Sequence, residues 1–328
     1  MGSLKELNTE GSNQAAPQQP GGRHRQAFWV GMLFTLSSAI LWGSTYPVIG
    51  VALNSYNAFD IALYRAILAS GTLVIYFLVS DRVRDMRPRR EDMSLLFLGS
   101  VFGASGFWTL LNISVLFLEA DTSSFLVALY PLIAIVLANI VLHERMTSFR
   151  AIGVIAGIAG TFIIVVFGEG AGFVGSQPVL GSIIAISAAF FWGGYMMTTK
   201  ILIERGKASG RGTSPEYITF YNFLLAIPVT LVLVLLSGSG QSFLSFSSEG
   251  LSLVLYLGVI ASGIAFLIFN KGIRLIGVSG AAINQLIFPA VAVILSYLFL
   301  GEVINLAEAL GMGLIVAGII VAQLLSRN

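Results

Sequence analysis

Residues 127–144 read VALYPLIAIVLANIVLHE, and residues 285–302 read QLIFPAVAVILSYLFLGE. Each stretch is an apolar run that contains a proline and ends in a glutamate. A single offset of 158 residues aligns three pairs, Pro131 with Pro289, Glu144 with Glu302, and Asn112 with Asn270. The chain therefore contains two copies of one unit, and we expect its function to lie where the two copies meet.

The composition is that of an integral membrane protein. Of the 328 residues, 56% are hydrophobic and 10% are charged, whereas soluble domains carry about 25% charged residues. Uncharged runs approach the roughly 20 residues that a helix needs to cross a bilayer. There is no cysteine, which excludes disulfides and thiolate metal sites. The polar N-terminal segment, residues 1–27, is expected to be disordered.

Ten transmembrane helices are predicted, over residues 28–49, 58–80, 94–118, 121–142, 149–167, 180–203, 215–237, 250–270, 276–300 and 305–325. If the N-terminus is cytoplasmic, every Lys and Arg except Arg65 lies on the cytoplasmic side, as the positive-inside rule requires. We therefore expect a multi-pass protein of the plasma membrane with both termini in the cytoplasm.

Five helices form each copy of the unit. The first repeat is predicted over residues 28–167, the second over residues 180–328, and residues 168–179 form an external linker. Because five is an odd number, the second copy enters the membrane in the opposite orientation. The predicted fold is thus an all-α integral membrane protein whose ten helices form two inverted five-helix repeats. Inverted repeats are typical of transporters, which bind substrate near the membrane midplane between the halves.

Three features resemble the EamA family of the drug/metabolite transporter superfamily. These are WGSTYP at residues 42–47, YRAILAS at residues 64–70, and the repeated proline helix that ends in a glutamate and precedes a glycine-rich helix. The resemblance covers roughly residues 28–325. It implies export or exchange of small metabolites, amino acids prominent among them. It also implies a central cavity lined mainly by the first, third, fourth, sixth, eighth and ninth helices.

Eight residues are candidates for substrate binding: Trp42, Tyr46, Arg65, Trp108, Trp192, Tyr195, Asn284 and Gln285. The aromatic side chains lie within spans, where they either wall an apolar site with a polar edge or serve ordinary helix packing. The single intramembrane arginine lies about seven residues, or roughly 10 Å, from the outer helix end. It either clamps a substrate carboxylate or snorkels outward. The two amides lie one turn before Pro289, beside an expected break in the helix.

Pro131 and Pro289 are candidate hinge or gate residues. Each proline clashes with the preceding turn, which kinks the helix. Each also lacks a backbone N–H, which leaves a carbonyl group free to face a cavity. Both prolines are expected near the middle of their helices. The alternative is a static kink that only shapes packing.

No catalytic residue, cofactor or metal site is expected. The GxSG segments at residues 103–106 and 277–280 have no histidine within reach of their serines, which a serine protease would need. The expected partners are a small-molecule substrate and the lipid bilayer, and not nucleic acid. Monomer and homodimer both stay open, because the glycine faces of residues 149–167 and 305–325 could join two halves or two protomers.

The first functional hypothesis is an alternating-access exporter or exchanger of small organic metabolites, with aromatic or apolar amino acids as the first substrates. Transport of phosphorylated or nucleotide-sugar-like metabolites is the alternative. A membrane channel or a non-transporting scaffold is the alternative of another class, and a membrane enzyme is disfavoured.

Overall fold

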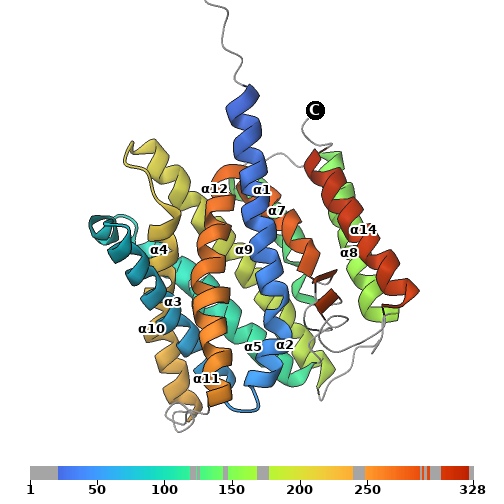
Figure 1. Ribbon diagram of the computed structural model, residues 1–328, viewed down its shortest axis with the longest axis horizontal. Helices are drawn as coiled ribbons and strands as arrows, with labels where there is room; N and C mark the ends of the chain where they lie inside the picture. The colour runs from blue at the N-terminus through green and yellow to red at the C-terminus, as the bar shows by residue number, and fades with distance from the viewer. Residues whose placement is uncertain are drawn as a thin grey trace, which may run out of the picture.

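The computed structural model describes residues 21–118, 126–142, 147–167, 177–238, 248–288 and 304–324, together with positions 123, 290, 291, 294 and 295. Every regular element in these residues is helical (Figure 1). Six described stretches are long and apolar enough to cross a membrane: Arg25–Ala52, Ala58–Val79, Met93–Phe117, Val179–Ala208, Pro215–Ser237 and Gly250–Ile287. Two further apolar stretches, Ser148–Ile164 and Leu306–Ala322, are shorter.

The first half of the chain forms helices close to the predicted positions, except that the first helix begins at Gly21, so residues 21–27 are helical and not disordered as predicted. They are α1 (Gly21–Gly43), α2 (Thr45–Ala52), α3 (Ala58–Val79), the short 3-10 helix η1 (Val83–Met86), α4 (Met93–Ser100), the π-helix η2 (Val101–Phe107), α5 (Trp108–Phe117), α7 (Tyr130–Leu142) and α8 (Ser148–Phe167). The predicted helix 94–118 is therefore three consecutive helical segments with a π-helix between two α-helices.

The second half contains α9 (Pro178–Ala208), α10 (Pro215–Ser237), α11 (Ser248–Leu255), the π-helix η4 (Tyr256–Ile264), α12 (Ala265–Asn284), the 3-10 helix η5 (Gln285–Ile287) and α14 (Leu306–Leu324). Helix α12 is broken at Gly277, whose φ of 77° and ψ of 175° lie in a region that glycine adopts without steric cost. The sequence predicts this connection at residues 271–275, but those residues are helical, and the break lies just inside the predicted helix 276–300.

Both arms of α12 pack against α1 (Figure 1). Gly272 on the first arm approaches the Thr35 side chain so closely that a Cβ at Gly272 would overlap it. On the second arm, the Asn284 amide donates a hydrogen bond of 2.7 Å to the Thr35 hydroxyl. The break at Gly277 thus lets the chain reverse direction around α1 and places the second arm beside the centre of the bundle.

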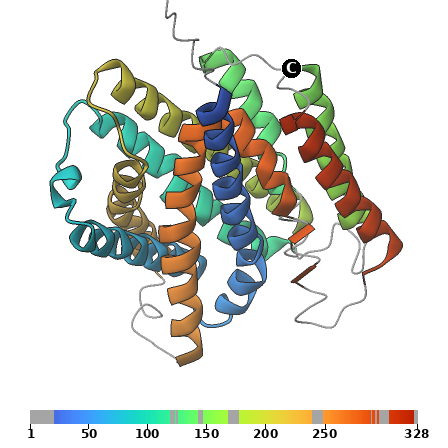
Figure 2. The ribbon, with the colours of Figure 1, turned by 45° about the horizontal axis from the view of Figure 1, so that its top comes forward.

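Helices α8 and α14 lie side by side at one edge of the molecule (Figures 1 and 2). A Cβ at Gly160 would lie 2.5 Å from the Gly311 carbonyl oxygen, and a Cβ at Gly311 would lie 2.6 Å from the Gly160 carbonyl oxygen. Gly153 and Gly318 approach one another in the same way. The glycine faces therefore join two helices of the same chain, by the close backbone approach typical of membrane helices.

Candidate functional site

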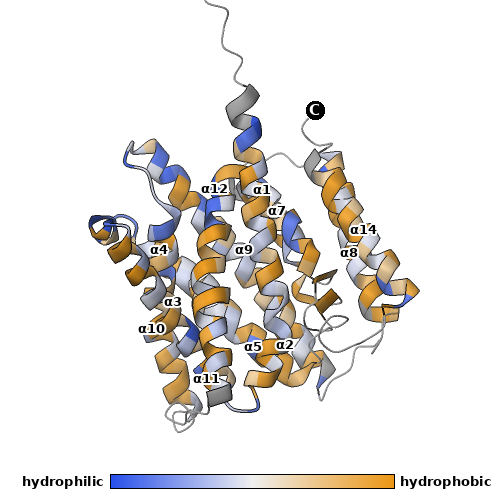
Figure 3. Ribbon diagram, in the orientation of Figure 1, coloured by the Kyte–Doolittle hydropathy of each residue, from blue (hydrophilic) through white to orange (hydrophobic). Residues whose placement is uncertain are grey.

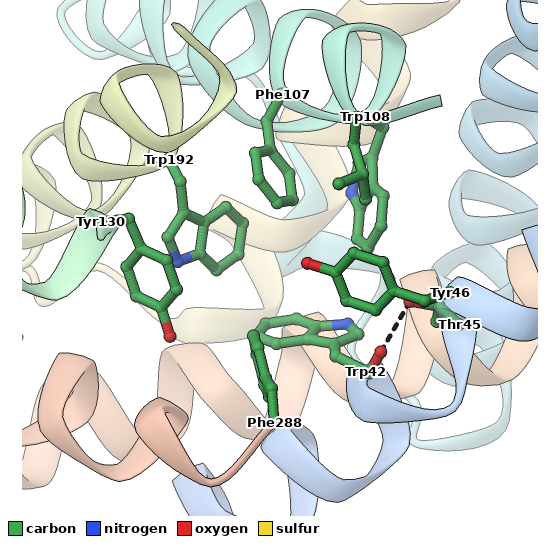
Figure 4. Close-up of a pocket in the computed structure, with 9 residues that line it drawn as sticks. Trp42, Thr45, Tyr46, Phe107, Trp108, Tyr130, Trp192 and Phe288 are labelled. Carbon is green, nitrogen blue, oxygen red and sulfur yellow. Dashed lines mark hydrogen bonds between the residues drawn. The ribbon is translucent and has the colours of Figure 1, made fainter. Parts of the chain in front are cut away.

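Nine buried side chains enclose a small chamber at the centre of the bundle (Figure 4). They are Trp42, Thr45, Tyr46, Phe107, Trp108, Leu111, Tyr130, Trp192 and Phe288, and Phe288, 7% exposed, is the most accessible of the aromatic ones. The chamber volume is about 10 Å³, which is near the minimum for one water molecule. An organic molecule therefore fits only if the lining side chains or their helices move.

Two tryptophans from opposite halves of the chain form the centre of the chamber wall. The rings of Trp42 and Trp192 meet edge to face, with centroids 5.1 Å apart. The indole N–H of Trp42 donates to the Ala261 carbonyl oxygen at 2.6 Å. The indole N–H of Trp192 donates to the Gln285 Oε1 at 3.0 Å. Each of these two indoles is therefore held in place by a hydrogen bond.

Arg65 lies directly behind Trp108. Its side chain is 0% exposed, and its guanidinium carbon lies 3.3 Å from the centroid of the Trp108 ring. Its Nε donates to the Ser262 hydroxyl at 2.9 Å, and neither Nη atom has a hydrogen-bond partner in the described part of the chain. Arg65 therefore points into the protein and does not snorkel outward.

The other predicted residues divide between the chamber lining and the layer behind it. Besides Trp42, Trp108 and Trp192, only Tyr46 of the eight candidates lines the chamber. Tyr195 packs on Trp192 with ring centroids 5.1 Å apart, and Gln285 reaches the chamber only through its bond to the Trp192 indole. Asn284 faces Thr35 of α1 instead.

Sequence reasoning missed five lining residues, namely Thr45, Phe107, Leu111, Tyr130 and Phe288. Two of these residues, Tyr130 and Phe288, could have been found from the repeat in the sequence. Tyr130 immediately precedes Pro131, and Phe288 immediately precedes Pro289, so the two aromatic residues occupy the same position in the two copies. Their ring centroids lie 6.2 Å apart across the chamber.

Of the two candidate hinge residues, the structure describes Pro131 but not Pro289. Pro131 lies in the first turn of α7, directly after a turn at Ala128 and Leu129. Residues 123, 126 and 127 are helical as well, so the helix predicted over residues 121–142 is interrupted just before Pro131. The missing proline N–H falls in the first turn of the segment after the interruption, where it breaks no helical hydrogen bond. Pro289 lies outside the described residues. A hinge role for either proline stays a prediction.

Hydrophilic residues gather at one end of the bundle, over the α3–α4 connection and the α9–α10 hairpin (Figure 3). Glu216, in the first turn of α10, lies at the centre of this cluster and is 5% exposed. Its Oε1 lies 3.2 Å from the Lys271 Nζ and 3.6 Å from an Arg82 Nη. It also accepts a hydrogen bond of 3.4 Å from the Tyr76 hydroxyl. One carboxylate thus ties α10 to α12, to α3 and to the α3–α4 connection.

Replacing Glu216 with glutamine is expected to destabilise this end by about 1–2 kcal/mol, because two cations lose their shared carboxylate in a largely buried position. The change is measured by denaturant unfolding in detergent. Glu204→Gln is the matched control: Glu204 pairs with Lys200 and Lys207, but its side chain is 46% exposed, and exposed pairs contribute about 0–1 kcal/mol. Equal effects of the two substitutions would contradict a central role for Glu216.

A model of the EamA-like transporter family matches residues 29–166 and 179–324. The chain is 27% identical over 282 residues to a probable terminal-alkyne amino-acid exporter of Streptantibioticus cattleyicolor, which covers 86% of this chain and 89% of that protein. It is also 27% identical over 280 residues to the uncharacterized transporter YdfC of Bacillus subtilis, covering 85% and 86% of the two chains.

The fold is similar to that of a known crystal structure. The TM-score is 0.72 at 18% identity, over 92% of this chain and 98% of the other. Since the family model covers most of the chain, and since the described helices include six that can cross a membrane, the protein is a multi-pass membrane protein that belongs to the EamA-like transporter family.

Proposed function

We propose that this protein is an alternating-access transporter that exports or exchanges small organic metabolites, with aromatic or apolar amino acids as the first substrate class. The chamber carries the proposal. Seven of its nine lining residues are aromatic, and two of its polar atoms, the Trp108 indole nitrogen and the Tyr130 hydroxyl, are buried without a partner among the described residues. An apolar lining with a few convergent polar groups is typical of small-molecule sites.

We propose further that ten helices form two inverted repeats in the plasma membrane, with both termini in the cytoplasm. The contact between α8 and α14 supports this arrangement. The offset of 158 that relates the copies carries Gly153 to Gly311 and Gly160 to Gly318. Exchanging the two copies therefore maps the observed pairs, Gly153 with Gly318 and Gly160 with Gly311, onto each other. A contact of this kind is expected at a two-fold axis in the membrane plane.

The two π-helices also support inverted repeats. In η2 the Ser105 hydroxyl donates to the carbonyl oxygen of Ser100, five residues earlier, at 2.8 Å. In η4 the Ser262 hydroxyl donates to the carbonyl oxygen of Leu257, also five residues earlier and at 2.8 Å. Both serines belong to an Ala-Ser-Gly triplet. The two copies thus share an irregular helical feature as well as a sequence pattern.

The relative from Streptantibioticus supports amino acids as the first substrates, since it is named a probable exporter of terminal-alkyne amino acids. Phosphorylated and nucleotide-sugar-like metabolites are less well matched to this chamber. None of its nine lining residues is basic, and Arg65 stands behind one of them. A dianionic phosphate would need more positive charge than these described residues supply.

The test is flux of radiolabelled L-phenylalanine and L-leucine in proteoliposomes that contain the purified protein. A transporter is expected to give uptake that saturates with concentration and accelerates when unlabelled substrate is present on the opposite side. Protein-free liposomes are the control. Uptake that never saturates would favour a channel, and uptake equal to that of the control across a panel of amino acids would contradict the proposed substrate class.

A further inference from the structure

We propose that Arg65 binds a carboxylate group of the transported molecule, and that the Trp108 indole covers this anion site until a carboxylate displaces it. The inference deepens the proposed function and rests on it, because it names the chemical group that the transporter recognises. It also assigns Trp108 a second role: its side chain lies against both the aromatic chamber and the Arg65 guanidinium, and it moves when a carboxylate binds.

The charge of Arg65 has no counter-ion in the described residues. Arg65 is 0% exposed, and every salt bridge in the described part of the chain joins other residues. The nearest acid on the same helix, Asp60, is five positions away, which places it about 140° around the helix. Intramembrane cations normally pair with an anion or face water. Because Arg65 is buried and pairs with no acid among the described residues, it is a candidate anion site.

The contacts of Arg65 leave the carboxylate-binding end of its guanidinium free. The Ser262 hydroxyl uses its proton on the Leu257 carbonyl oxygen within the π-helix η4, so its oxygen accepts the Arg65 Nε–H. This bond fixes the Nε side of the guanidinium. The Nη1 and Nη2 atoms have no partner among the described residues, and together they present two N–H groups that match the two oxygens of a carboxylate.

Trp108 contacts both the guanidinium of Arg65 and the chamber. Its ring lies over the guanidinium and also lines the chamber (Figure 4), while its indole nitrogen is buried without a partner among the described residues. A cation–π contact partly compensates a desolvated cation, but a carboxylate that binds through two charge-assisted hydrogen bonds compensates it more strongly. We therefore expect a carboxylate bound at the Nη atoms to compete with the indole for the cation.

The position of Trp108 in the chain suits a side chain that moves. It directly follows the π-helix η2, and π-helical segments are irregular and frequent at functional sites. Once the indole leaves the guanidinium, the anion site and the aromatic chamber become one space. That space fits a molecule with a carboxylate at one end and an aromatic or apolar group at the other.

The test is ¹⁹F NMR of the full chain, labelled with 5-fluorotryptophan and reconstituted in nanodiscs. The chain has four tryptophans, and Trp108→Phe identifies the Trp108 resonance by its loss. Millimolar L-phenylalanine and 3-phenylpropionate are expected to shift that resonance. L-Phenylalaninamide, which lacks the carboxylate, is expected to leave it unchanged. The Trp29 resonance is the internal control, since Trp29 is 46% exposed at the start of α1.

Variants of Arg65 separate an anion site from a structural role. Arg65→Gln is expected to shift the Trp108 resonance without ligand and to abolish its response to both carboxylates. Arg65→Lys keeps the charge but loses the planar fork, so we expect it to retain the response with affinity about 10-fold weaker. A lysine variant without any response, in a chain that still elutes as a folded monodisperse species, would contradict an electrostatic anion site.

Two outcomes would overturn the inference while leaving the transporter proposal intact. One is a Trp108 resonance that responds to L-phenylalaninamide as strongly as to L-phenylalanine. The other is saturable amino-acid flux in proteoliposomes under conditions in which neither carboxylate moves Trp108. Conversely, an Arg65-dependent shift by both carboxylates without any flux would support the anion site and would contradict transport.

Discussion

Gly311→Ala is expected to destabilise the protein by about 1–3 kcal/mol, the typical cost of forcing a methyl group into a closely packed interface. The new Cβ would lie 2.6 Å from the Gly160 carbonyl oxygen. That oxygen belongs to the backbone of α8 and cannot rotate away as a side chain would. The α8 and α14 helices must therefore separate, and denaturant unfolding in detergent measures the loss.

Gly313→Ala is the matched control on the same helix. Gly313 is exposed, and no atom lies within 4 Å of its would-be Cβ. Alanine has the higher helix propensity by about 1 kcal/mol, so this variant is expected to be as stable as the wild type or slightly more stable. Equal unfolding midpoints for the two variants would contradict the close approach of α8 to α14.

Trp192→Ala is expected to reduce amino-acid flux at least 10-fold. Trp192 meets Trp42 at 5.1 Å and Phe107 at 4.7 Å between ring centroids, and its ring stacks on Phe269 at 5.6 Å. Losing the indole opens a hole in the chamber wall and removes the hydrogen bond to the Gln285 amide. The free energy of unfolding is expected to fall by about 3–5 kcal/mol, as for other buried tryptophans.

Two further variants separate loss of folding from loss of function at this position. Trp192→Phe keeps an aromatic wall but loses the hydrogen bond, so we expect it to fold and to transport at an intermediate rate. Trp29→Ala, outside the chamber, is expected to transport at the wild-type rate. Flux is compared at equal amounts of monodisperse protein. Wild-type flux in both Trp192 variants would show that the chamber is not on the substrate path.

Much of the helical framework could be predicted from the sequence, because bilayer-length apolar runs have few alternatives to helix. The helix at residues 215–237 begins at a proline and ends before a glycine, and both signals are readable. The connection near residues 271–275 was predictable as a basic segment between apolar runs. The reversal itself lies beyond that segment, at Gly277, whose positive φ is tied to the packing of both arms of α12 against α1.

The aromatic part of the chamber was partly predictable, since matched tryptophans at positions 42 and 192 in the two copies indicate a shared position. The repeated aromatic residue before each proline was an available signal for Tyr130 and Phe288. The burial of Arg65 was not predictable, because an arginine 10 Å from a membrane surface by helical rise can either snorkel or turn inward. The choice depends on Trp108 and Ser262, which lie far from Arg65 in the sequence.

The most direct test of the inverted repeat is the side of the membrane on which three single cysteines react with an impermeant maleimide in intact cells. The natural chain has no cysteine, so each substitution reports alone, and Asn54, Arg87 and Lys207 are all exposed positions. Two inverted five-helix repeats predict that Asn54→Cys is labelled from outside, whereas Arg87→Cys and Lys207→Cys are both protected until the cells are opened. Labelling of positions 87 and 207 from opposite sides would contradict the repeat and the alternating access that it implies.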